Sequence, residues 1–74
     1  MKVYEMWLID ATSDFYSTSE KAYNALMEVL DNYSQGVSDE DIEQMKEELT
    51  KSYEEDNEFY GIEDFGGVIT HEVY

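Results

Sequence analysis

The chain of 74 residues has no cysteine, no proline and no arginine, and its only basic side chains besides one histidine are four lysines. The absence of cysteine excludes a disulfide framework, a thiolate zinc site and a thiol nucleophile. One histidine leaves too few ligands for a structural transition-metal centre. No apolar run approaches the ~20 residues that span a bilayer, and no basic segment precedes an apolar one as in a signal peptide. We therefore expect a cytoplasmic protein with no metal, no cofactor and no membrane contact.

The composition predicts a folded chain with a strong negative charge. Nineteen acidic residues against four lysines give a formal net charge of −15. Such a charge is typical of disordered chains. However, 42% of the residues are apolar, and the chain contains seven tyrosines, three phenylalanines and one tryptophan, whereas disordered chains are poor in aromatic residues. Residues 1–74 are enough for one small domain. The charge repels nucleic acids and anionic lipids, so we expect a basic partner and no direct binding of nucleic acid.

The first half of the chain predicts a strand followed by a helix. Residues 3–11 alternate with a period of two and are largely apolar on both faces, which indicates a central strand. Residues 12–14 are expected to form a turn. A helix over residues 18–34 is predicted from apolar residues three and four apart. Ser17 and Glu20 have the spacing of a capping box, and Gly36 is placed for a C-terminal cap.

The second half predicts a surface helix and two short strands. Ser38 caps a helix that runs to about residue 54, and its apolar stripe is narrow, so the helix is expected to be held along one edge. A short strand is expected around residues 59–62, a turn at Gly66 and Gly67, and a final strand over residues 68–74. The order β-α-α-β(β) predicts an α+β domain with its helices packed on one face of a short antiparallel sheet.

Acidic residues are concentrated between positions 39 and 64, where only Lys46 and Lys51 oppose them. On a helix, the ten acids from 39 to 58 place about one carboxylate per ~3 Å, close to the ~3.4 Å between phosphates of one DNA strand. Two interpretations stay open: a solvated acidic face that keeps the protein in solution, and a surface that imitates nucleic acid for a basic groove. The candidate contact residues are Asp39, Glu40, Asp41, Glu43, Glu47, Glu48, Glu54, Glu55, Asp56, Glu58, Glu63 and Asp64.

In size, charge and lack of arginine the whole chain resembles the small acidic proteins by which bacteriophages block host defences, the DNA-mimic anti-restriction and anti-CRISPR inhibitors. Residues 15–22, FYSTSEKA, are similar to the segment after the first strand in small phage proteins. The resemblance implies a non-enzymatic inhibitor that acts in the host cytoplasm as a monomer or homodimer. Its partner would be a basic nucleic-acid-binding protein such as a CRISPR effector or a restriction enzyme.

Two other classes of function, an adaptor domain and an enzyme, make different demands on the sequence. A small adaptor domain would bind its partner through an apolar surface that includes residues such as Trp7 or Tyr23. An enzyme would need a partner for the one histidine, His71, and its neighbour Glu72 is expected on the opposite face of the strand. A calcium loop that starts at Asp56 fails, because its twelfth residue is Gly67 rather than glutamate. We therefore predict no catalytic residue and no metal ligand.

Overall fold

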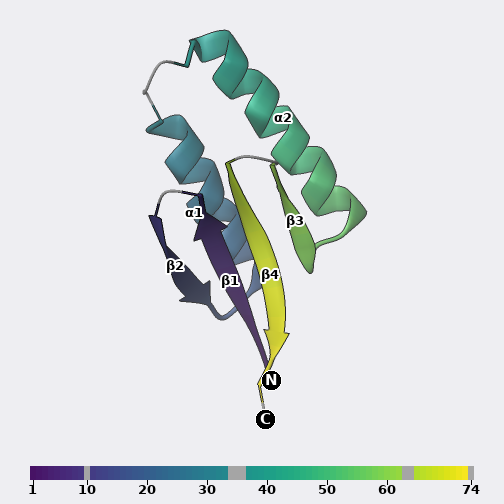
Figure 1. The fold of residues 1–74 in the computed structure, drawn as a ribbon. Coiled ribbons are helices and arrows are strands. Elements are labelled where there is room, and N and C mark those ends of the chain that lie inside the picture. The colour runs from purple at the N-terminus through teal and green to yellow at the C-terminus, as the bar shows by residue number, and fades with distance from the viewer. Residues whose placement is uncertain (10, 34–36, 63–64, 74) are drawn as a thin grey trace.

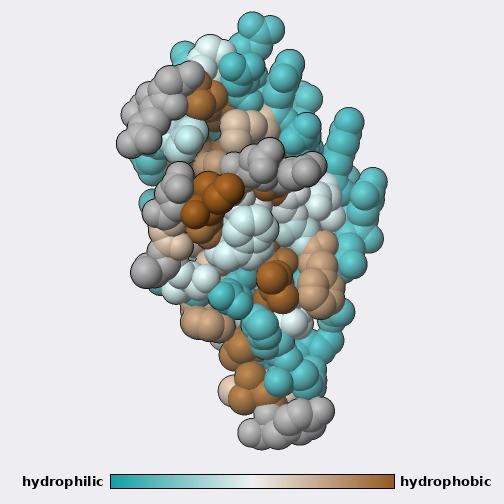
Figure 2. Space-filling model, in the orientation of Figure 1, coloured by the Kyte–Doolittle hydropathy of each residue, from teal (hydrophilic) through white to brown (hydrophobic). Residues whose placement is uncertain are grey.

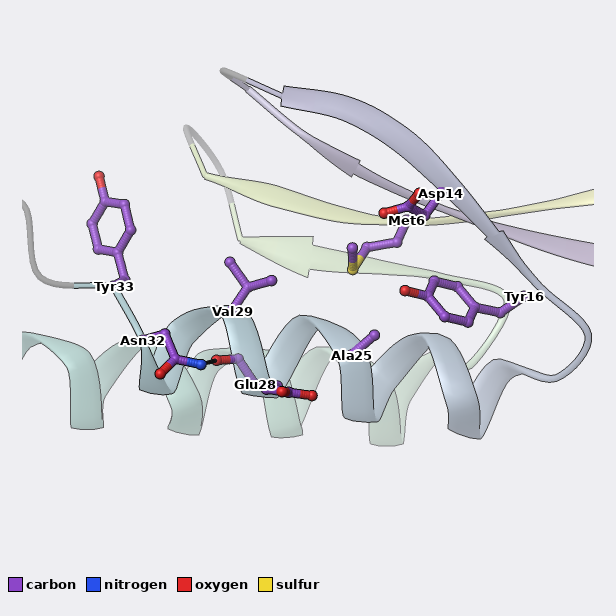
Figure 3. A pocket seen from close by; sticks show the side chains of 8 residues that line it. All are labelled: Met6, Asp14, Tyr16, Ala25, Glu28, Val29, Asn32 and Tyr33. Carbon is purple, nitrogen blue, oxygen red and sulfur yellow. Dashed lines mark hydrogen bonds between the residues drawn. The ribbon is translucent and has the colours of Figure 1, made fainter.

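Six elements follow one another along the chain in a computed structural model that describes residues 1–9, 11–33, 37–62 and 65–73 (Figure 1). They are β1 (Lys2–Leu8), β2 (Ala11–Tyr16), α1 (Ser19–Asp31), α2 (Asp39–Glu55), β3 (Phe59–Ile62) and β4 (Gly66–Glu72). The strands form one antiparallel sheet in the order β2-β1-β4-β3. Both helices lie on the same face of this sheet (Figures 1 and 3). The predicted α+β class and the central position of the first strand are confirmed.

The core lies between the sheet and α1. Ala22, Leu26 and Leu30 recur every four residues on α1, and all three are fully buried. They pack against Met6 of β1 and Val68 of β4, which are 3% and 1% exposed. These residues belong to the helix side of the sheet, and the opposite face of the sheet carries no helix. Alternation along β1 therefore places Val3, Glu5 and Trp7 on this open face.

The helix ends depart from the predicted caps at α1 and agree with them at α2. Thr18, not Ser17, is the N-cap of α1: its hydroxyl accepts a hydrogen bond from the Lys21 N–H at 3.1 Å. α1 ends at Asp31, three residues earlier than predicted, and its C-cap Asn32 donates both its backbone N–H and its side-chain amide to the Glu28 carbonyl, at 3.2 and 3.0 Å. The predicted cap Gly36 lies outside the described residues. Ser38 caps α2 as predicted.

Two predicted turns are wrong, because both segments belong to strands. Residues 12–14 lie within β2, which pairs with β1 across a register shift, and β1 ends at Leu8. Gly66 and Gly67 begin β4 between β1 and β3. A Cβ atom on Gly67 would lie 2.6 Å from the Tyr60 carbonyl oxygen and 3.1 Å from the indole nitrogen of Trp7. The glycine is therefore required by close packing within the sheet rather than by a turn.

Candidate interaction surface

α2 contacts the rest of the protein along a narrow strip. Ile42 and Leu49 are its buried residues, and Met45 and Tyr53 are half-buried beside them. The strip packs on α1 and β3, with the Tyr53 ring 4.3 Å from that of Tyr23. As predicted, the helix is held along one edge, so most of its circumference is exposed to solvent.

Eight of the predicted contact residues are carried by α2, and the side chains of all eight are exposed. The helical period of 3.6 residues divides them into two rows that lie roughly 120° apart around the axis. We call them together the acidic helix surface: the first row is Asp39, Glu40, Glu43, Glu47 and Glu54, and the second row is Asp41, Glu48 and Glu55.

Lysine neutralises little of the acidic helix surface. The Lys46 ammonium group forms an ion pair with Asp31 of α1 and lies 4.0 Å from Glu43. The hydrogen bond that Lys46 donates to Asp31 raises the pKa of Lys46 above its usual value, and the charges of Asp31 and Glu43 add to this effect while desolvation opposes it. Lys51 forms no ion pair with a described residue. One lysine is thus directed toward α1, and Glu43 is the single member of the surface with an ion pair among the described residues.

The other predicted contact residues have different positions. Asp56 accepts hydrogen bonds from the N–H groups of Glu58 and Phe59, at 3.0 and 3.3 Å, and so shapes the connection into β3. Glu58 is half-buried and forms an ion pair with Lys2, which raises the pKa of that lysine. Glu63 and Asp64 lie outside the described residues. The structure therefore brings eight of the twelve predicted contact residues onto one helix, and two others, Asp56 and Glu58, have contacts within the fold.

A second surface lies on the open face of the sheet, and the sequence pattern does not predict it. The register places Phe15, Glu5, Ile69 and Phe59 in one row across all four strands. Phe15 and Phe59 are 63% and 56% exposed, and Ile69 lies between them. Figure 2 shows this face, with apolar side chains interspersed with hydrophilic ones over the strands and hydrophilic side chains along α2. The alternation of β1 indicates one part of this face, whereas the composition of residues 12–14 predicts a turn and so gives no sign of the part that β2 contributes.

His71 has a partner that the sequence reasoning missed. Its Nε2 atom lies 2.7 Å from Oε1 of Glu5, on the neighbouring strand of the same open face. Hydrogen bonds from Ser13 and from His71 hold the pKa of the Glu5 carboxyl below its usual value. The partner considered from the sequence, Glu72, is the next residue in the chain, whereas Glu5 lies on the adjacent strand of the sheet. His71 itself is exposed, and its ring is 6.4 Å from that of Phe15.

Neither helix of the described part of the chain is long and apolar enough to cross a membrane. Among the described residues, no three histidine, aspartate or glutamate side chains converge as a metal site would require. Comparison of the chain with protein-family models, with curated proteins and with solved structures found no match in any of the three.

Proposed function

We propose that this protein is a non-enzymatic inhibitor that presents the acidic helix surface to the basic DNA- or RNA-binding groove of a host defence protein, such as a CRISPR effector or a restriction enzyme. The observation that supports the proposal is the exposure of eight carboxylates on one helix of 17 residues. Lysine and arginine side chains that hold phosphates in the target would hold these carboxylates instead. Bound inhibitor then excludes nucleic acid from the groove.

The geometry of α2 favours this partner over a solvated face alone. A helix of 17 residues is roughly 25 Å long, so its eight carboxylates lie about 3 Å apart along the axis. Their density is similar to that of phosphates along a DNA strand. Like charges three and four residues apart cost a few tenths of a kcal/mol per pair, and a helix selected for stability alone would contain more lysine. The packing of α2 on α1 and β3 holds the two rows in place.

The test is a pull-down from bacterial lysate at ~50 mM and ~500 mM salt, with mass spectrometry of the bound proteins and a DNA-binding assay on the captured protein. We expect capture at low salt, release at high salt and loss of DNA binding by the captured protein. Glu43→Lys and Glu47→Lys together should weaken binding on the order of tenfold, and adding Glu54→Lys should weaken it further.

The matched control carries Glu20→Lys and Glu72→Lys, which change the net charge equally on two exposed residues outside α2. If binding weakens equally in the control and in the Glu43/Glu47 variant, the effect depends on the total charge of the protein and not on the acidic helix surface. Inhibition that persists unchanged in the triple variant of α2 would exclude the proposal.

The open face of the sheet supports a second candidate, an adaptor domain that binds through apolar contacts. Large apolar side chains are exposed there, and half-buried Trp7 lies beside Gly67 on the same face. In this case the captured partner is retained at ~500 mM salt and lost on the substitution Trp7→Ala. Tyr23, the other apolar residue predicted for this role, packs against Tyr53 in a cluster with Tyr60 and belongs to the helix side.

A further inference from the structure

The hydrogen-bond pattern of β1 determines which backbone groups of β2 are paired. Val73 N–H donates to the Met1 carbonyl at 2.7 Å, the Met1 amino group donates to the Val73 carbonyl at 3.2 Å, and Ile9 N–H donates to the Phe65 carbonyl at 3.0 Å. Odd-numbered residues of β1 therefore direct their backbone groups toward β4. Because these directions alternate along an antiparallel strand, the even-numbered residues direct theirs toward β2.

It follows that Phe15 directs its N–H and C=O away from the sheet. Tyr16 and Asp14 lie opposite the even-numbered residues Tyr4 and Met6, so their backbone groups face β1. Phe15 lies between them and faces the other way. No described residue forms a hydrogen bond with either of its backbone groups. β2 is the edge of the sheet, so an unpaired donor and acceptor are exposed there.

The opposite edge of the sheet is treated differently. By the same alternation, Phe59 and Gly61 direct their N–H groups outward from β3. The Phe59 N–H donates to Oδ1 of Asp56 at 3.3 Å, and the Gly61 N–H donates to the Ser52 hydroxyl at 3.1 Å. Both groups are thus satisfied from α2 and its C-cap. Between the two edges in the described part of the chain, β2 is therefore the one with an outward N–H, that of Phe15, that has no acceptor.

A groove of about 440 Å³ lies beside β2 on the helix side of the sheet (Figure 3). Met6 and Val29 line it from β1 and α1, and the Tyr16 ring lies at one end. Asp14 of β2 and Glu28 of α1 add two carboxylates, and no lysine lines the groove in the described part of the chain. Neither carboxylate forms an ion pair with a described residue. An apolar groove with an acidic rim suits a long side chain with a methylene stem and a cationic end.

We propose that the edge of β2 binds an extended segment of another protein as a fifth strand, in which basic residues alternate with apolar ones. The residue opposite Phe15 pairs with its free N–H and C=O, and its side chain lies on the open face beside the exposed Phe15 ring. The residues on either side of it point to the helix side, along the groove. Apolar residues suit the first position, and lysine or arginine suits the other two.

Charge complementarity selects this occupant over a second copy of the chain. Two copies that pair through β2 would each bring a net charge of −15 to the interface, whereas a basic segment brings the opposite charge. The site is separate from the acidic helix surface, because α2 packs on β3 and β2 forms the other edge of the sheet. The inference is therefore independent of the function proposed for α2.

The probe is an acetylated and amidated heptapeptide in which lysine alternates with valine, titrated into isotope-labelled protein and followed by the backbone amide shifts of β2. Two N-methylated forms of the peptide have identical charge and apolar content. Methylation at the valines blocks the amides that face β2, and methylation at the lysines blocks those that face solvent. We expect the valine-methylated form to bind about tenfold more weakly than the lysine-methylated form. Equal affinities, or the reverse order, would overturn the proposal.

Variants of the protein locate the same site. Phe15→Pro removes the outward N–H in a position that an edge strand tolerates, and Phe15→Ala keeps it. Only the proline variant should lose the peptide, with circular dichroism to verify its fold. Asp14→Asn with Glu28→Gln should weaken binding, while Glu47→Gln with Glu54→Gln, the same charge change on α2, should not. Equal weakening by both pairs, or a dimer of the free protein that dissociates on the substitution Phe15→Pro, would contradict the assignment.

Discussion

The backbone N–H of Gly61 donates a hydrogen bond to the side-chain hydroxyl of Ser52 at 3.1 Å, and this contact joins the outer edge of β3 to α2. Gly61 has no side chain, and an added Cβ would lie 2.6 Å from the Gly66 carbonyl oxygen. The strand is therefore packed closely on β4 from one side and bonded to the helix from the other. α2 presents its acidic residues to solvent while its inner edge completes the hydrogen bonding of the sheet.

The substitution Ser52→Ala should destabilise the protein by about 0.5–1 kcal/mol. It leaves the half-buried Gly61 N–H without its partner, and the higher helix propensity of alanine offsets part of the loss. For a domain of this size the change corresponds to a fall of roughly 2–8 °C in Tm. Ser52→Thr keeps the hydroxyl and should retain most of the stability. Thermal unfolding of the three proteins decides the question, and equal Tm values for wild type and the alanine variant would contradict the role of this bond.

The contribution of Tyr60 to the stability of the protein should be lost in strong alkali. Burial raises the pKa of its phenol to about 12, and its hydroxyl donates to the Ser19 carbonyl at 2.9 Å. The unfolded chain loses this proton near pH 10, before the folded protein does. The contribution of the protonated phenol to the free energy of unfolding is therefore complete below pH 10 and is lost as the pH rises to about 12.

Urea unfolding of wild type and of Tyr60→Phe at pH 8, 10 and 12 tests this expectation, because titration of the other groups is common to both proteins. Wild type should be more stable at pH 8 by about 1 kcal/mol, and the difference should shrink toward pH 12. A difference that is constant over this range would show that the phenol titrates alike in the folded and unfolded states.

Added salt should stabilise the protein, because the net charge of −15 repels itself in the compact state. We expect Tm to rise by several degrees between ~10 mM and ~500 mM sodium chloride, as screening over about one Debye length weakens the repulsion. Glu43→Gln, Glu47→Gln and Glu54→Gln together remove three charges from one row of the acidic helix surface, and this variant should show a smaller rise. A rise as large as that of wild type would place the repulsion elsewhere.

The helices and the acidic surface could be predicted because their signals are local. The spacing of Ile42, Met45 and Leu49 indicates a helix held along one edge, and the hydroxyl of Ser38 three residues before Asp41 marks its start. The charged positions of α2 then follow from the helical period alone. The end of α1 is predicted less well: the apolar spacing continues to Tyr33, whereas the helix ends at Asp31 with Asn32 as its C-cap.

The errors concern contacts between residues that are distant in sequence. Residues 12–14 have a turn-like composition, yet they lie within β2, which pairs with β1 through Asp14 and Ala11 on either side of a register shift. Gly66 and Gly67 have the composition of a turn, but Trp7 and Tyr60 require their small size. The partner of His71 is Glu5, which lies 66 residues away along the chain. A local pattern contains no information on which strands become neighbours.

The sequence by itself therefore determined the α+β class, the capped second helix and the carboxylates that this helix exposes, because periodicity and charge are properties of neighbouring residues. The tertiary structure alone decided which side of each strand is covered and which edge of the sheet is free. Those outcomes depend on strand order. β1 lies between β2 and β4, so β2 and β3 form the two edges of the sheet. α2 packs on the edge formed by β3, and the backbone of Phe15 is exposed at the edge formed by β2. Strand order follows from burial across the whole fold, and no single segment of the chain specifies it.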